Sequence, residues 1–438
     1  MPRRLLTTFA LLLALASSPV HAGDDITYYD QVAPLVHSHC ADCHRPGGAA
    51  PFSLLTHRDV ADRAEDVLRV VKSGEMPPWK AVGKPGEFVG DRRLTENQKR
   101  LLEQWIAGGT PAGPRRELRL PRRDANGWRP GQPDIVLQPA ALGSRVPANL
   151  LAVDLDQEDL WVAGIEVRPQ QAGLHHMLLW LDLPVTSPVL EVDRAGQLVH
   201  RQLVPAWLRD RWLAPAPSAL RPAERAAAIA ARDRRLIGVW AADCLAQSFP
   251  RDSAIRFPAG SRLIVETSAE RAPPMEIGLY VSGAPPERPA AVVAVEAILP
   301  RLATARDLPR QGAFQTPVDC ELHVIAPHAD ASCRGIRVNL TLPDGHSESL
   351  LWIDDWDPRW ETSYQYRRAL QLPAGSRIDV QFVPGGGGEE ARDVTLPALV
   401  AAQLVPLQAG DYDELVRAMQ RTQMTAAREP VKAKWGWR

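Results

Sequence analysis

The sequence predicts a multidomain protein in which a small all-α domain precedes a larger all-β region. The chain has 438 residues, enough for several domains at roughly 100 to 200 residues each. Apolar residues recur at three- and four-residue steps before residue 112, which is typical of helices. Short alternating apolar runs separated by Pro- and Gly-containing turns follow, and they are typical of strands in sandwiches or barrels.

The first 22 residues have the pattern of a secretory signal peptide. Arg3 and Arg4 precede a short apolar run, and the small residues Val20 and Ala22 precede a polar segment. The apolar run is shorter than the roughly 18 residues that a membrane span needs. We therefore expect residues 1–22 to be a cleaved signal peptide and the mature protein to be soluble, in the periplasm or secreted.

The charge balance excludes one class of partner. The formal net charge is -1 and charged residues make up 24% of the chain, so no basic field attracts nucleic acid. We expect no nucleic-acid partner.

Residues 23–112 form the predicted helical domain, and they contain a haem-attachment motif. Cys40, Cys43 and His44 have C-x-x-C-H spacing, in which two thiols about one helical turn apart can form thioethers to one haem and the histidine can bind the iron. Met76, in the proline-bracketed segment MPPW, can supply the second axial ligand. Met/His ligation suits electron transfer. The prediction is a covalently bound haem c.

This segment resembles the cytochrome c family over roughly residues 25–112. The resemblance rests on the motif, the MPPW segment and the helix-forming sequence at 94–109, and it implies that Cys40, Cys43, His44 and Met76 bind the haem. His37 and His39 precede the motif, and we expect them to be solvated or to lie at the haem edge.

The β-rich region begins after a predicted linker over residues 113–134, which is rich in Pro, Gly and Arg. We expect two sandwiches, over residues 135–290 and 291–408, and a C-terminal helix and tail over 409–438. Residues 221–235 indicate an exposed helix or an insertion. Strands are expected at 261–268, 277–283, 290–298, 321–327, 335–342, 349–356 and 376–384.

Residues 128–407 resemble the copper type II, ascorbate-dependent monooxygenases, the family of peptidylglycine α-hydroxylating and dopamine β-monooxygenases. The similarity is carried by HHM at 175–177, PDG at 343–345 and the block LLWIDDWDPRW at 350–360. It implies two jelly-roll-like sandwiches that each carry one copper. One copper accepts electrons, and the other activates oxygen and abstracts hydrogen from a substrate carbon.

The copper ligands that the resemblance implies are only partly present. His175 and His176 match the adjacent pair of the electron-accepting copper, and His328 matches one ligand of the oxygen-activating copper. Asp330 stands where the family has a second histidine, and a carboxylate is a harder donor that disfavours reduced copper. The third histidine and the methionine ligand are missing, and Glu266 lies in the region where that histidine is expected.

The remaining cysteines are Cys244, Cys320 and Cys333, and pairing is expected in an exported protein. A disulfide between Cys320 and Cys333 is the first choice from their spacing. Cys244 is then either a buried thiol or the partner of one of the other two, because sequence does not fix the connectivity.

Two functions follow from these features. The first is a periplasmic c-type haem oxidoreductase in which the haem passes electrons to a copper-monooxygenase-like module, which hydroxylates a C–H bond if its copper sites are intact. The second is a non-catalytic electron-transfer or metal-binding protein on the same scaffold. The expected partners are a redox protein or a small reductant, together with a small-molecule or peptide substrate in the catalytic case.

Overall fold

The computed structural model describes most of the chain between residues 26 and 422, in segments. These are 26–46, 50–83, 86–117, 128, 130–141, 148–155, 158–170, 174, 176–183, 190–192, 198–200, 234–241, 247–250, 252–267, 269–297, 310–385 and 398–422. The predicted signal peptide and Cys244 lie outside the described residues, as does most of the stretch at 221–235, whose last two residues begin a strand.

The described N-terminal residues form short helices around a core of their own, in which Tyr28, Val32 and Trp105 are almost fully buried. Thr95 and Gln98 form a capping box at the start of the longest helix, because each side chain accepts a hydrogen bond from the other residue's backbone N–H. Helices at 28–40 and 94–109 were predicted. The elements are η1 (Tyr28–Val32), α1 (Ala33–His39), α2 (His57–Ala61), α3 (Ala64–Ser73) and α4 (Glu96–Ala107).

Four antiparallel sheets make up most of the described chain. The first has strands β1 (Ile135–Leu137), β12 (Met275–Val281), β4 (Leu160–Pro169) and β10 (Ile255–Phe257), with β9 (Gln247–Ser248) paired to β4. The second has strands β2 (Ala140–Ala141), β3 (Leu150–Asp154), β11 (Arg262–Thr267), β5 (His176–Asp182) and β8 (Arg234–Ala241). These two sheets enclose one hydrophobic core.

The third and fourth sheets enclose a second core. The third has strands β13 (Ala291–Glu296), β20 (Leu399–Pro406), β15 (Cys320–His328) and β18 (Tyr364–Leu372). The fourth has strands β14 (Arg310–Gln315), β19 (Arg377–Pro384), β16 (Cys333–Thr341) and β17 (Ser347–Ile353). The remaining elements are the hairpin β6 (Leu190–Val192) and β7 (Leu198–His200), the 3-10 turns η5 (Pro358–Trp360) and η6 (Ala409–Asp411), and a helix over 412–422.

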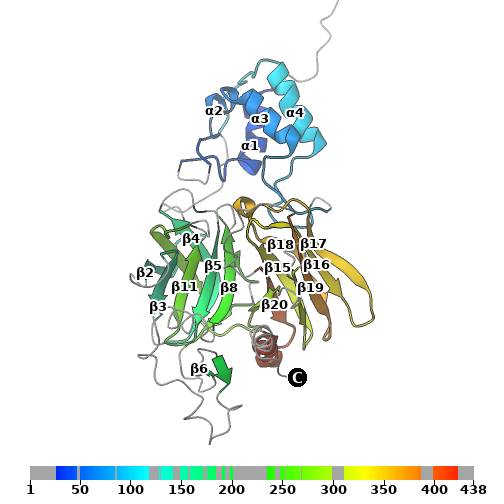
Figure 1. Cartoon of the computed structure of the whole chain (residues 1–438). Coiled ribbons are helices and arrows are strands. Elements are labelled where there is room, and N and C mark those ends of the chain that lie inside the picture. The colour runs from blue at the N-terminus through cyan, green and yellow to red at the C-terminus, as the bar shows by residue number, and fades with distance from the viewer. Residues whose placement is uncertain are drawn as a thin grey trace, which may run out of the picture.

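The third sheet is shared by both cores. Every residue of β20 is buried, and its side chains alternate between the two sides. Leu399 and Ala401 pack into the core of the first two sheets, whereas Val400 and Ala402 pack into the other core. β8 of the second sheet lies against β13, β15 and β20. The four sheets therefore form one stack with a common inner layer (Figure 1).

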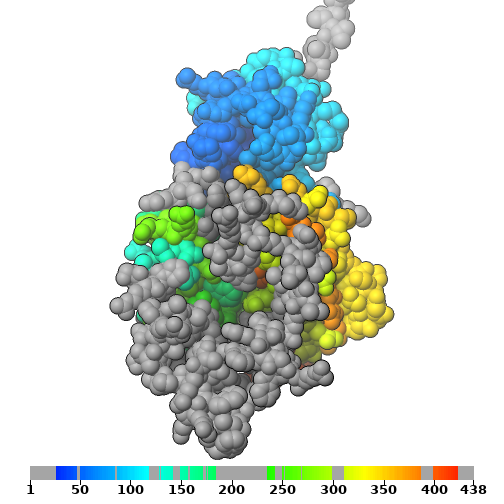
Figure 2. Space-filling model, in the orientation of Figure 1, coloured from blue at the N-terminus to red at the C-terminus, as the bar shows by residue number. Residues whose placement is uncertain are grey.

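The helical segment also contributes to the stack of four sheets, called the β body below. The connection between α3 and α4 forms bridges from Val82 to Trp352 and from Phe88 to Tyr366. Ala81 and Phe88 are buried in the core of the third and fourth sheets. In the space-filling view the blue helical lobe sits directly on the β body (Figure 2).

These findings correct the predicted fold class. The expected arrangement, a small all-α cytochrome c domain followed by tandem jelly-roll-like sandwiches, is wrong. The chain is mostly β, the helical elements are few and short, and their longest connection completes a β core. Tandem sandwiches need two independent cores, but here one sheet is buried on both faces.

No helix among the described residues is long and apolar enough to cross a membrane.

Candidate metal centre

His176 is placed at the meeting point of the second and third sheets. It is the first residue of β5, which is buried along its whole length and pairs with β8 and β11. Its side chain is 7% exposed, and Nδ1 lies 3.1 Å from the backbone oxygen of Pro358. That oxygen can only accept, so Nδ1 carries the proton and Nε2 keeps its lone pair. His175 lies outside the described residues.

His328 approaches the same point from the third sheet. It is the last residue of β15, pairs with Leu399 of β20 and is 1% exposed. Its Nδ1 lies 3.0 Å from both carboxylate oxygens of Glu361. Its Nε2 is buried and has no hydrogen-bond partner among the described residues. A buried imidazole nitrogen without a partner is costly unless something binds there.

Glu361 completes the group. It follows the turn η5, where the Asp357 side chain accepts a hydrogen bond from the Arg359 N–H, and it precedes β18. The residue is 2% exposed, and its Oε2 lies 3.9 Å from Nδ1 of His176. An unpaired carboxylate this deeply buried would be strongly destabilised. His328 is its hydrogen-bonded partner, and the His176 ring lies at 3.9 Å.

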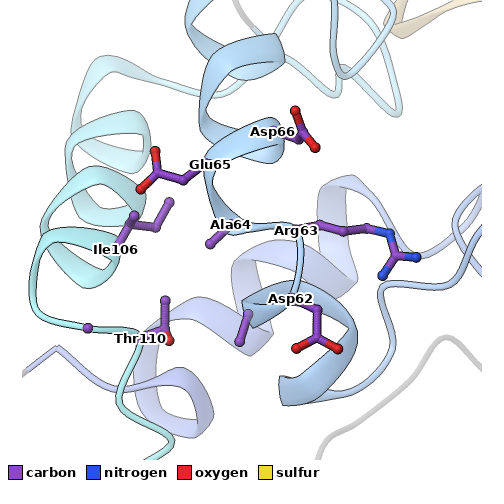
Figure 3. Close-up of a pocket in the computed structure, with 9 residues that line it drawn as sticks. Asp62, Arg63, Ala64, Glu65, Asp66, Ile106 and Thr110 are labelled. Atoms are coloured by element: carbon purple, nitrogen blue, oxygen red, sulfur yellow. The ribbon is translucent and has the colours of Figure 1, made fainter.

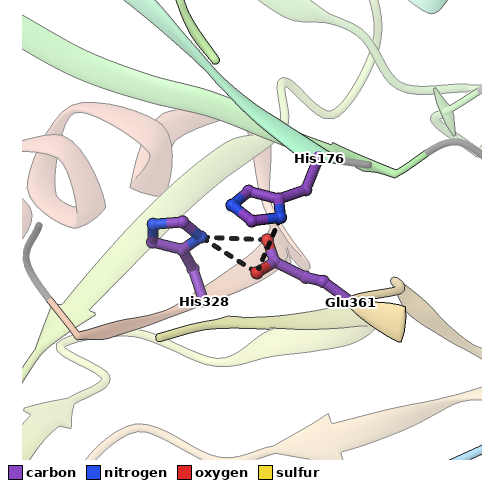
Figure 4. A group of neighbouring side chains, drawn as sticks. All are labelled: His176, His328 and Glu361. Carbon is purple, nitrogen blue, oxygen red and sulfur yellow. Dashed lines mark hydrogen bonds and ion pairs between the residues drawn. The ribbon is translucent and has the colours of Figure 1, made fainter. Parts of the chain in front are cut away.

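The three side chains converge from separate elements and offer one ligand atom each, all within 4.8 Å of one another (Figure 4). Burial lowers the pKa of His328, but the charge and hydrogen bond of Glu361, together with the charges of Glu266 and Asp330, raise the pKa above its ordinary value. The same negative charge favours a bound cation. Two imidazoles and a carboxylate that meet in a buried place fit a mononuclear metal ion.

The structure places the predicted copper ligands differently from the expectation. His176 and His328, assigned by resemblance to two separate coppers, lie side by side with ring centroids 5.1 Å apart. Asp330 is not part of the group, because its Oδ1 accepts hydrogen bonds from the backbone and hydroxyl of Ser332. Glu361 takes the place that Asp330 was expected to fill.

Sequence reasoning missed Glu361. The residue lies in the block WETSY at 360–364, and nothing in its spacing relates it to either histidine. The one signal was a carboxylate amid aromatic residues of an apolar block, where an acidic side chain is seldom buried without a partner. Glu266, noted where the third histidine was expected, accepts a hydrogen bond from the Trp180 indole and raises the pKa of His328 through its charge.

The residues of the haem motif lie on one helical turn after α1. The backbone N–H of His44 donates to the Cys40 oxygen at 2.9 Å, so the thiol of Cys40 and the imidazole of His44 are spaced as in a helix. His44 Nδ1 lies 3.2 Å from the Phe52 oxygen, and burial lowers the pKa of His44. A neutral ring held through Nδ1 presents Nε2 as a ligand, so the residues fit covalent haem attachment. Burial raises the pKa of Cys40 to about 12.

Met76 lies half-buried three residues after the end of α3, and its backbone N–H donates to the Val70 oxygen at 3.0 Å. The histidines before the motif have other contacts. His37 Nε2 lies 3.1 Å from the Leu55 oxygen, and His39 Nδ1 lies 3.0 Å from the Arg92 oxygen. Both rings are therefore held by backbone oxygens.

Cys320 and Cys333 carry free thiols in the structure, which differs from the predicted disulfide. The two residues begin β15 and β16, which belong to different sheets. Cys320 is the first residue of β15, which has nine residues and spans about 26 Å, and Cys333 follows the other end of that strand. The two cysteines are therefore too far apart for a disulfide, which needs Cα atoms less than about 7 Å apart. Burial raises the pKa of both thiols to about 12.

A pocket of about 270 Å³ lies between α3 and the end of α4 (Figure 3). Its lining includes Asp62, Glu65, Asp66, Ile106 and Thr110. It contains no residue of the haem motif or of the metal group, so it is not the candidate site.

Comparisons with known proteins place the chain in no family. No protein-family model matches it, and no curated protein matches it significantly. Among solved structures, the tandem CBM22-1–CBM22-2 domain of Paenibacillus barcinonensis Xyn10C matches at 12% identity and a TM-score of 0.14, over 60% of this chain and 85% of that one. A Paenibacillus xanthan lyase matches at 12% identity and a TM-score of 0.16, over 68% of this chain and 28% of that one. Similarity this weak carries no argument about function.

Proposed function

We propose that the protein is an oxidoreductase with two redox centres, a covalent haem c and a mononuclear metal ion. The haem is attached at Cys40 and Cys43, with His44 and Met76 as axial ligands. The metal ion is held by His176, His328 and Glu361. The observation that carries the proposal is the convergence of these three buried side chains, whose ligand atoms lie within 4.8 Å of one another.

The donor set favours a redox-active divalent metal. Imidazole suits iron, copper and zinc, and two histidines with one carboxylate and open positions are characteristic of non-haem iron(II) oxygenases. The group has no thioether, so it favours iron(II) or copper(II) over copper(I). When bound, such an ion can exchange single electrons and polarise a ligand at an open position.

The protein's own residues orient the ligands. The Pro358 oxygen holds the His176 ring through Nδ1, and a contact of this kind fixes the orientation and tautomer of a ligating histidine. Glu361 lies 3.0 Å from Nδ1 of His328. An ion bound by both residues would replace the proton between them, and the charge of Glu361 would balance the charge of the ion.

A second candidate is an electron-transfer or metal-binding protein without substrate turnover. The observation that favours it is burial, because the three side chains are 7%, 1% and 2% exposed. An electron can reach a buried ion, but a substrate must contact it.

The cellular setting follows from the proposed haem and the N-terminal pattern. We propose that the protein acts in the periplasm or outside the cell, where a small reductant or a redox protein supplies electrons to the haem.

Haem and metal analysis of the purified holoprotein tests the proposal. We expect one covalent haem by the pyridine haemochrome spectrum and one iron or copper ion per chain beyond the haem iron. The variant His328→Ala should keep the haem and lose the metal. Zinc as the only metal, or no metal, would contradict the proposal. Oxygen uptake with a reductant then separates turnover from electron transfer alone.

A further inference from the structure

The connection between α3 and α4 is tightly fixed to the third and fourth sheets. The backbone N–H of Val82 donates to the Trp352 oxygen, and that of Val89 donates to the Gln365 oxygen, both at 2.7 Å. Lys80 forms an ion pair with Asp355 at 2.7 Å. The helical segment and the β body therefore meet in a defined geometry.

Four aromatic side chains fill this junction. The rings of Trp79 and Tyr364 lie edge to face with centroids 5.3 Å apart, and Phe88 lies 5.3 Å from Tyr364. Phe88 also lies 5.0 Å from Tyr366. Tyr364 is 1% exposed, and Trp79 packs against the same core. The Trp79–Tyr364 contact is thus a dry contact between two parts of the chain that are far apart in sequence.

Each ring of this pair is close in sequence to one proposed ligand. Trp79 follows Met76 by three residues, and Tyr364 follows Glu361 by three residues. Three residues of chain span at most about 11 Å, so each ring stays close to one proposed ligand. Glu361 in turn contacts His328. A continuous path of bonded and packed groups joins Met76 to the metal group through these two rings.

We propose that Trp79 and Tyr364 carry electrons from the haem to the metal centre, an inference that rests on the proposed function. With both groups bound, the transfer would balance as one electron lost by ferrous haem, which would become ferric, and one electron gained by the metal ion. No bond forms or breaks, and the external reductant restores the ferrous haem. The two rings in contact provide π orbitals across the junction.

Flash photoreduction of the haem in the full-length holoprotein tests the path. A photosensitiser reduces the ferric haem, and the haem absorption band then reports its reoxidation as the electron reaches the metal. We expect a first-order phase that is independent of protein concentration. The variant Trp79→Leu should slow this phase by about tenfold or more, because loss of the indole ring raises the barrier to electron transfer. Trp79→Phe retains an aromatic ring and should restore most of the rate.

Trp352→Leu is the matched control, because its indole is 41% exposed and outside the Trp79–Tyr364 contact. It should leave the rate unchanged. The haem potential, measured by redox titration, should be the same in all variants, so a slower phase reports the path.

The outcomes separate the inference from the proposed function. A missing haem or metal contradicts the function. Full haem and metal content with an unchanged rate in Trp79→Leu, or with no concentration-independent phase in the wild type, overturns the path alone.

Discussion

The rings of His176 and His328 lie with their centroids 5.1 Å apart at an interplanar angle of 68°, although they come from strands of different sheets. Two metal ions, each with its own ligands, need two separated groups of side chains. At this distance both histidines could bind one ion.

Glu361→Gln should weaken metal binding, because the amide keeps the shape of the side chain but removes its charge. We expect the affinity to fall by about 10- to 100-fold, as for other groups that orient or charge-balance metal ligands. Asp330→Asn is the control, since Asp330 bonds Ser332 and not the histidines. Metal titration followed by spectroscopy measures both. Equal losses in the two variants would contradict the assignment of Glu361.

The stability of the metal-free protein should depend on pH through His328. Its pKa is raised in the folded state, so its contribution to the free energy of unfolding is fully present below the ordinary value of 6.5. The contribution is lost as the pH rises through the folded-state pKa, by on the order of 1 kcal/mol. Denaturant unfolding of the chelated protein at several pH values measures it. Glu361→Gln should flatten this dependence, and an unaltered slope would argue against the pair.

Met76→Ala should retain the covalently attached haem, because attachment depends on the cysteines, and should lose the sulfur-to-iron charge-transfer band. The haem potential should fall, since a thioether ligand raises it. Met419→Leu is the control, because Met419 is 6% exposed in the C-terminal helix and lies outside the haem segment. A charge-transfer band that survives in Met76→Ala would show that another residue is the sulfur ligand.

Cys320 and Cys333 should not react with iodoacetamide in the native protein at pH 8. Both are buried, and a thiol with a pKa of about 12 is ionised to only roughly one part in 10,000 at that pH. After denaturation without a reductant, both should be alkylated, as mass spectrometry of the peptides can show. Alkylation that requires prior reduction would mean that the two thiols are oxidised.

Phe88→Ala should destabilise the β body, although Phe88 belongs to the segment between two helices. Its side chain is 3% exposed in the core of the third and fourth sheets, and truncation of a buried phenylalanine costs about 3–5 kcal/mol. Phe52→Ala, at a side chain 36% exposed, should have a much smaller effect. Thermal unfolding followed by the β-sheet signal in circular dichroism compares the two. A normal melting temperature for Phe88→Ala would contradict the shared core.

Local features of the fold were predictable from the sequence because they depend on neighbouring residues. The apolar run at 290–298 became β13, and the capped, periodic segment at 94–109 became α4. The fold class was not predictable, because the mostly apolar sequence of β20 does not show that its two faces serve different cores. The same limit applies to the junction at Phe88, which depends on a contact with Tyr366 far along the chain.

The candidate site was predictable in its histidines and not in its assembly. His176 and His328 were singled out by their surroundings in sequence, but their grouping depends on how the second and third sheets meet. Glu361 was missed because it becomes a partner of His328 only when β15 and β18 lie side by side.

β20 has a consequence for the order of folding. It lies between β13 and β15, and it is the last strand among the described residues. Until residues 399–406 have been synthesised, the sheet shared by the two cores lacks the strand that joins β13 to β15. Neither core can therefore be completed while the chain is still being synthesised up to β20. His328 pairs with Leu399, so it reaches its final position only when almost the entire chain is available.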